Sequence, residues 1–183
     1  MEQQYIKQGQ IEGDSLSDYV ESLYTALKDD SKKTVPRYGF QVGYLNLLIG
    51  AGVRSELVKK SSIYPLPNTA DWFQGLINLR GSLVPVFDIY QILDIEQDKR
   101  MKSHLLILDT DQQAVAVSIR QLPTILDDIR PLPAMPTVPD ALIESVGNAY
   151  SGDHTTWLEF DHKVFFSQLA QNMAEILPEH SYT

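Results

Sequence analysis

The stretch from Gly75 to Asp88, GLINLRGSLVPVFD, decides how this chain folds. Two apolar runs stand on either side of Arg80 and Gly81, which predicts a hairpin that turns at these two residues. The second run continues from Leu83 through Phe87 without an alternating polar residue, a pattern that predicts a strand buried on both faces. Because Pro85 has no N–H, we expect this strand at a sheet edge or at a bulge.

The charged residue at the turn is the candidate for binding. An arginine at the mouth of a hairpin is fixed in place while its guanidinium fork stays free, which suits Arg80 to a carboxylate or a backbone carbonyl of a partner. The alternative is an ordinary surface arginine on a turn, and this segment alone does not separate the two interpretations.

The rest of the chain predicts short strands and a few helices. Alternating or continuous apolar patterns predict strands at 38–44, 46–49, within 57–63, and at 104–108, 114–119, 146–150 and 156–160. Asp88 is expected to cap a short helix, and Asp161 to cap a final helix with Phe165 and Leu169 on its apolar face. Four prolines between Pro131 and Pro139 predict a loop that makes no ladder hydrogen bonds.

These elements predict a mainly β fold. Two groups of short strands around short helices indicate two small β-barrels, roughly at 38–95 and 103–160, within a domain that spans 36–178. Residues 1–35 form an N-terminal extension in which apolar residues from Leu16 to Leu27 recur at helical spacing. This amphipathic helix is expected either to pack on its own domain or to dock on a partner.

Composition excludes several classes of partner. The chain has 183 residues and a formal charge of -9, so it carries no surplus of cations with which to neutralise nucleic-acid phosphates. It has no cysteine, which fits a reducing cytoplasm. No run reaches the roughly 18 apolar residues of a membrane span, and the first 13 residues lack the apolar core of a signal peptide. We therefore expect no direct insertion into a membrane.

The sequence offers no enzyme motif. The four histidines, His104, His154, His162 and His180, do not stand at the spacing of a helical metal pair. Asp153 beside His154 and Asp161 beside His162 are expected to make surface hydrogen bonds. No phosphate loop, dinucleotide fingerprint or nucleophile elbow is present. We expect a protein without catalytic residues, metal or cofactor; the alternative is a β-barrel that binds a small ligand at its mouth, with Trp72 or Trp157 in the pocket rather than in the core.

Several motifs together resemble one family. GLINLRG at 75–81, VPVFD at 84–88, IYPLPN at 63–68, WFQG at 72–75 and the glutamate Glu56 are similar to the signature of CheW-like coupling domains. The likeness is close over 40–93 and continues as a hydrophobic pattern to about residue 169. It implies two intertwined five-stranded β-barrels with flanking N- and C-terminal helices.

The resemblance also implies a function. CheW-like proteins are cytoplasmic adaptors that join the tip of a methyl-accepting chemoreceptor to the regulatory domain of a CheA-type histidine kinase, so this chain would be recruited to membrane receptor complexes. Carried over by motif, the residues expected at the contact surface are Glu56, Gly75, Asn78, Leu79, Arg80 and Gly81.

Within this family, one branch is the most similar. RYGFQVG at 37–43, TWLEF at 156–160 and the N-terminal helix resemble the PilI-like proteins of type IV pilus twitching motility. One departure concerns Arg54, which stands where many flagellar members have a small or aliphatic residue. The choice of receptor or kinase is therefore expected to differ from theirs.

Overall fold

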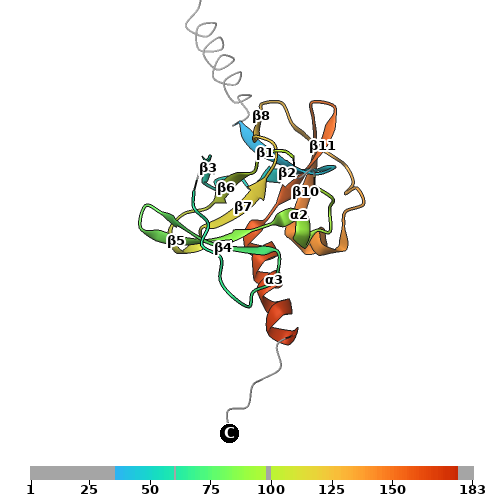
Figure 1. Cartoon of the computed structure of the whole chain (residues 1–183). Helices are drawn as coiled ribbons and strands as arrows, with labels where there is room; N and C mark the ends of the chain where they lie inside the picture. Colours follow the sequence, from blue (N-terminus) through green and yellow to red (C-terminus); the bar gives the residue numbers. More distant parts are fainter. Residues whose placement is uncertain (1–35, 60, 98–99, 177–183) are drawn as a thin grey trace, which may run out of the picture. The chain divides into compact units, whose positions relative to one another are not determined.

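The structure is a computed structural model that describes residues 36–59, 61–97 and 100–176, with side chains up to Asn172 in the last helix. The predicted N-terminal helix at 16–27 lies outside the described residues. Figure 1 shows the described part as two β-sheets with one longer helix, α3, below them. The prediction of a mainly β protein is confirmed.

The first sheet has six strands rather than five. Their order is β8-β1-β2-β11-β10-β9. Their bounds are β1 Arg37–Val42, β2 Leu45–Ile49, β8 Thr124–Leu126, β9 Arg130–Pro131, β10 Val146–Gly152 and β11 Thr155–Phe160. The neighbours pair antiparallel except β2 and β11, which run parallel with Leu47 opposite Leu158.

The second sheet has the expected five strands. Their order is β3-β6-β7-β5-β4, so β3 and β4 are its two edges. Their bounds are β3 Ser55–Val58, β4 Phe73–Leu79, β5 Ser82–Phe87, β6 His104–Leu108 and β7 Val115–Ile119. Only β5 and β7 pair parallel, through Val86 and Phe87.

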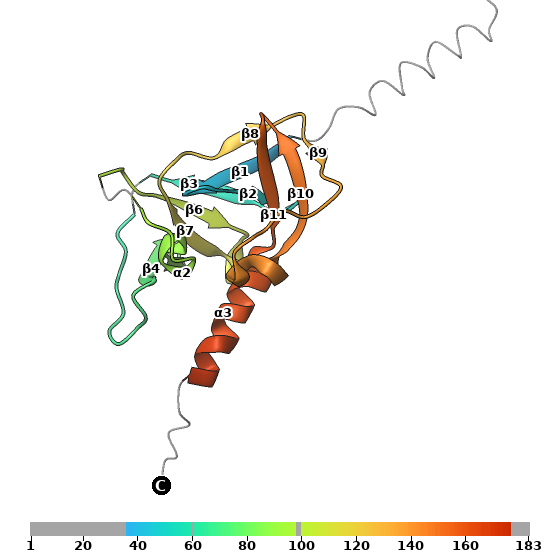
Figure 2. The same ribbon diagram turned by 90° about the vertical axis from the view of Figure 1, so that its right-hand side faces the viewer.

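The two sheets do not follow the expected division of the domain into 38–95 and 103–160. The first sheet takes β1 and β2 from the first range and β8 to β11 from the second, and the second sheet also mixes the two ranges. In Figures 1 and 2 the blue strands of the N-terminal part lie beside the orange strands β10 and β11. The intertwining expected for the fold thus takes place within the sheets themselves.

Short helices connect some of the strands, and one longer helix follows the last strand. Among the described residues, the α-helices are α2 Ile89–Ile92 and α3 His162–Ile176, and the 3₁₀ helices are η1 Asp111–Gln113 and η2 Asp140–Ser145. Both predicted caps are confirmed: the Asp88 carboxylate accepts from the N–H groups of Tyr90 and Gln91, and the Asp161 carboxylate accepts from Lys163 and Val164. These bonds satisfy N–H groups that the first helical turn leaves without a partner.

The described residues form three apolar cores: a small one of Leu48, Leu126 and Trp157 in the first sheet, and two larger ones. The larger of these two joins both sheets and α3, and its most buried members include Phe40, Leu47, Ile89, Val117 and Phe160. The smaller of the two lies within the second sheet and contains Ile77, Val84, Val86, Leu105, Ile107, Ala114 and Ala116. Since the smaller core is built by β4, β5, β6 and β7, it supports the hairpin that carries Arg80.

Strand β5 corrects two predictions about the deciding stretch. It is buried on one face only, because Val84 and Val86 are buried whereas Leu83 is 66% exposed. It also lies between β7 and β4 rather than at an edge. Pro85 is tolerated there because neither neighbouring strand needs the N–H that proline lacks. Its partner Leu76 uses its own N–H and C=O in hydrogen bonds with Tyr64, and the ladder with β7 starts only at Val86.

Two smaller predictions also change. Pro131 does join a ladder, opposite Tyr150, but in the two-residue edge strand β9, where a proline can be accommodated. Tyr38 shares the strand face of Phe40 and Val42, as predicted, although it is 46% exposed, whereas Tyr44, expected on the same face, is 72% exposed. Tyr44 already belongs to the turn after β1, and Tyr38 lies near the outer end of that strand.

Candidate partner-binding site

The β4–β5 hairpin turns in two residues, as predicted. Arg80 has φ 52° and Gly81 has φ 94°, and Leu79 pairs directly with Ser82. Two consecutive positive φ angles are the signature of a type I′ turn, whose preferred residues are asparagine or aspartate followed by glycine. Asn78 fixes the turn further, because its Oδ1 accepts a hydrogen bond of 2.8 Å from the N–H of Gly81.

Arg80 is therefore an unusual residue for its position. The left-handed conformation costs an ordinary L-residue about 1–2 kcal/mol, and glycine or asparagine would remove much of that cost. The side chain of Arg80 is 75% exposed, so it contributes little burial in return. Its presence at the tip is better explained by what its side chain binds than by the stability of the turn.

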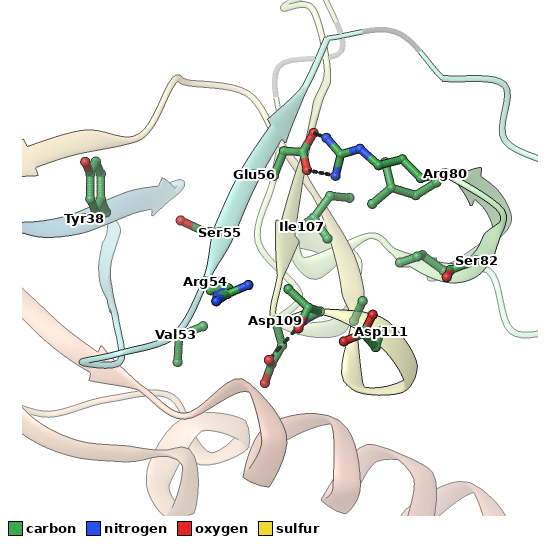
Figure 3. A pocket seen from close by; sticks show the side chains of 14 residues that line it. Tyr38, Val53, Arg54, Ser55, Glu56, Arg80, Ser82, Ile107, Asp109 and Asp111 are labelled. Atoms are coloured by element: carbon green, nitrogen blue, oxygen red, sulfur yellow. Dashed lines mark hydrogen bonds and ion pairs between the residues drawn. The ribbon is translucent and has the colours of Figure 1, made fainter.

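The fork of Arg80 is not free, contrary to the prediction. Its two terminal nitrogens donate to the two carboxylate oxygens of Glu56 at 2.8 and 2.7 Å, a bidentate ion pair. Glu56 stands in the edge strand β3 and Arg80 in the turn that follows the other edge strand, β4, so the pair links the two edges of the second sheet (Figure 3). The Glu56 side chain is 40% exposed, and so water still screens the pair and limits its value for stability.

Of the six predicted residues, five lie at or near this tip and Gly75 does not. Gly75 is buried near the start of β4, beside a bulge, with φ 127°. A Cβ atom at this position would lie 2.2 Å from the carbonyl oxygen of Tyr64 and 2.8 Å from the Cα atom of Pro65. Its role in this structure is to let the 64–65 segment cross β4 closely.

A cavity of about 710 Å³ opens beside the ion pair. Its floor is apolar, formed in part by Val84, Ile107 and Ala114, whereas its rim carries Arg54, Asp109, Asp111 and the Arg80–Glu56 pair. Figure 3 shows Arg54 and Asp109 between the ion pair and helix α3. The cavity opens onto the smaller core, and Arg54, the residue expected to depart from the family pattern, lines it.

Tyr38 borders this cavity from the first sheet and adds an apolar surface that the sequence did not reveal. It is paired in register with Ile125 of β8, which is 55% exposed, so both side chains lie on the same face of the first sheet. Adjacent exposed apolar residues of this size are typical of interaction sites. The sequence pattern could not show this pair because its two strands are more than eighty residues apart.

A cluster of ionisable groups lies near the cavity, where the C-terminal end of β6 meets α3. Lys163 Nζ lies 2.8 Å from Asp109 Oδ2, and this hydrogen bond holds the pKa of Asp109 below its usual value. His162 is buried, 3.6 Å from the same carboxylate, and its burial lowers its pKa. The expected surface pairing of His162 with Asp161 is therefore wrong, because the histidine ring points inward toward Asp109.

The two tryptophans lie in packed positions. Trp157 is buried against Gly39, where any Cβ atom would lie 2.1 Å from the indole ring. Trp72 stacks on Phe87 with ring centroids 6.0 Å apart and borders a small apolar cavity of about 360 Å³. Within the described ranges, no three histidine or carboxylate side chains gather closely enough to hold a metal ion.

Comparison with known proteins identifies the family. The profile of the CheW-like domain matches residues 39–169 of this chain. A protein named Chemotaxis protein CheW from Thermotoga maritima is 33% identical over 54 residues, which are 30% of this chain and 36% of that protein. The match thus spans about a third of the length of this curated relative.

A solved structure supports the same fold. The crystal structure of the scaffolding protein TtCheW from Thermoanaerobacter tengcongensis superposes with a TM-score of 0.54 and 24% identity, covering 68% of this chain and 87% of that chain. Among the described residues, no helix is long and apolar enough to cross a membrane. Since the family profile covers well over half of its residues, this chain belongs to the CheW-like domain family.

Proposed function

We propose that this chain is a cytoplasmic, non-enzymatic adaptor that couples methyl-accepting chemoreceptors to a CheA-type histidine kinase. The observation that carries the proposal is the match to the CheW-like family over residues 39–169. The name of the Thermotoga relative links that protein to chemotaxis, and TtCheW, the protein of the solved structure, is described as a scaffolding protein.

The hairpin tip supports a contact role. It offers a charged group, Arg80, that is largely exposed, strained in its backbone and held in one orientation by Glu56. A preoriented guanidinium loses less rotamer freedom on binding than a mobile one. In this proposal Glu56, Asn78, Leu79, Arg80 and Gly81 form the charged contact, and Gly75 sets the backbone behind it.

The apolar pair beside the cavity supplies a second kind of contact. Tyr38 and Ile125 lie side by side on one face of the first sheet, and Tyr38 also lines the cavity beside Arg80. A charged tip next to an apolar face suits a coiled-coil receptor tip or a β-rich kinase domain, because protein interfaces combine a hydrophobic centre with a polar rim.

Binding of both partners tests the adaptor role. Calorimetric titration of the full chain with the cytoplasmic part of a receptor, and separately with the regulatory domain of the kinase, is expected to show two independent one-to-one complexes. Absence of both complexes would refute the proposal. Binding of one partner alone would reduce it to a receptor-binding or kinase-binding protein.

We further propose that this adaptor serves the type IV pilus branch, on the basis of the motifs at 37–43 and 156–160. Deleting its gene should abolish twitching and leave flagellar swimming unchanged, and the intact gene supplied in trans should restore twitching. Loss of swimming with normal twitching would instead assign the adaptor to the flagellar pathway.

The cavity of 710 Å³ favours one alternative function, the binding of a small ligand. Its apolar floor and polar rim are typical of such sites. Replacing Ala114 on the floor with leucine should fill part of the cavity. If ligand binding is the function, this variant should lose signalling while both protein complexes remain intact, whereas an adaptor would signal normally.

A further inference from the structure

A second groove lies on the C-terminal side of the molecule, between η2 and α3. It has a volume of about 560 Å³, and residues of α2, η2 and α3 line it. The two helices that form its walls are tied together where α3 begins, because the N–H of Asp161 donates to the carbonyl oxygen of Ser145 at 2.8 Å. In Figure 2 η2, drawn in orange, lies beside the N-terminal part of α3.

The groove has an apolar base. Phe165 is buried at 3% exposure, and Ile92 and Leu169 are half-buried along it. Ile143 stands at the rim and is 56% exposed, although its neighbour Leu142 is completely buried. Covering an exposed isoleucine beside an apolar groove removes its apolar surface from water, which favours binding of a partner there.

The rim of the groove carries negative charge only. Asp140 and Glu144 line it, and no lysine or arginine is among the described residues that do so. Glu144 accepts a hydrogen bond from the side-chain amide of Gln168, which is a neutral donor and leaves the charge uncompensated. The sequence around the groove offers few positive charges to neutralise these carboxylates, since Lys163 is the only lysine or arginine after Arg130.

We propose that this groove binds a basic amphipathic helix of a partner protein. An apolar face would fit over Phe165, Leu169 and Ile143, and flanking lysines or arginines would approach Asp140 and Glu144. The same carboxylates disfavour the anionic surfaces of lipid membranes and nucleic acids. The inference does not rest on the adaptor role, because Arg80 and Glu56 do not line this groove.

A synthetic peptide of leucine and lysine, arranged as one apolar and one basic helical face, serves as the probe. Calorimetric titration of the full chain should show one site, with an affinity that falls as salt rises. Asp140→Asn with Glu144→Gln should weaken binding about tenfold, and Ile143→Asp by at least as much. An isosteric control, Asp128→Asn with Asp153→Asn, removes two exposed carboxylates elsewhere and should change the affinity less than about twofold.

Several results would overturn the proposal. These are no binding by the wild type, equal losses in the groove and control variants, or a peptide of leucine and glutamate that binds as tightly. Binding to vesicles of phosphatidylserine that the groove variants abolish would show a membrane surface instead. Amide shifts of the wild-type protein provide a check independent of folding: the peptide should perturb Ala141 and Gln171, and unperturbed signals there would place the peptide elsewhere.

Discussion

Arg80 combines an unfavourable backbone with an exposed side chain, and this combination allows stability and binding to be separated. Arg80→Asn introduces the preferred first residue of a type I′ turn before Gly81. The variant loses only a screened ion pair, worth about 0–1 kcal/mol, and should be at least as stable as the wild type. If Arg80 anchors a partner, its loss should cost about 2 kcal/mol of binding, roughly a thirtyfold weaker complex by calorimetry.

Two further variants complete that measurement. Arg130→Ala is the matched control, because Arg130 is 80% exposed and also pairs with a carboxylate, that of Asp128. It should bind both partners normally. Arg80→Lys keeps the charge and loses the planar fork, so a loss close to that of asparagine would assign the effect to bidentate geometry. Unchanged affinity of Arg80→Asn for both partners would rule out the anchoring role.

The glycines of the deciding stretch differ in physical role, which a second prediction makes measurable. Gly75→Ala combines a positive φ with a Cβ atom 2.2 Å from the Tyr64 carbonyl oxygen, and should cost about 3 kcal/mol or more. The melting temperature should then fall by about 6–12 °C. Gly81→Ala meets open space and bears only backbone strain, about 1–2 kcal/mol, and Gly147→Ala, with neither problem, should melt like the wild type.

A different order among the three glycine variants would contradict this account. In particular, a Gly81→Ala variant less stable than Gly75→Ala would mean that the turn, rather than the crossing at 64–65, limits the stability of the hairpin.

At the scale of single elements, the hairpin and both helix caps could be predicted because their causes are local. A two-residue turn, an aspartate before a helix and an alternating strand each depend on neighbours in the sequence. The burial of β5 could not be predicted, because the exposure of its face at Leu83 depends on what distant parts of the chain pack over that face. The pairing of Arg80 with Glu56 was missed for the same reason, although both residues were singled out.

The start of α3 should make stability depend on pH. Burial lowers the pKa of folded His162, so the unfolded chain, with a histidine pKa near 6.5, binds more protons below that value. The free energy of unfolding should therefore be level above pH 6.5 and fall on acidification, by at most about 1.4 kcal/mol per pH unit. The pKa of Asp109 is also lowered, but this carboxylate adds to the loss of stability on acidification only below about pH 3.8.

Denaturant titrations between pH 7.5 and 5 measure this slope, and His162→Gln should flatten it. His154→Gln is the control, because His154 is exposed in the turn between β10 and β11 and its substitution should leave the slope as it is. An equal slope in wild type and His162→Gln would assign the acid sensitivity to other groups.

At the scale of the whole molecule, the topology lay beyond the sequence pattern. Strand β11 pairs parallel with β2 although about a hundred residues separate them, and β8 adds to β1 from the middle of the chain. Nothing in a local apolar pattern specifies such partners; the resemblance to a family supplied the intertwining, and the residues alone supplied only two groups of strands. The apolar surface of Tyr38 and Ile125 follows from this topology and was therefore missed.

A molecule that presents separate contacts to two partners should show a concentration optimum. In a reconstituted system of receptor, kinase and this chain, kinase autophosphorylation should need the receptor, rise with added adaptor and then fall. The fall follows from mass action, because excess adaptor occupies receptor and kinase separately and leaves few ternary complexes. Arg80→Asn should shift the optimum to higher concentration, since weaker binding requires more adaptor to form the same complex.

An enzyme that modifies the kinase would behave differently, because each molecule would act many times and no optimum would appear. Full activation at trace amounts of this chain without receptor would therefore contradict a scaffold. Titrating the adaptor from far below to far above the kinase concentration separates the two, since a scaffold's optimum moves with the concentrations of its partners and a catalyst's effect depends on time. An optimum that doubles when receptor and kinase are both doubled is the expected result.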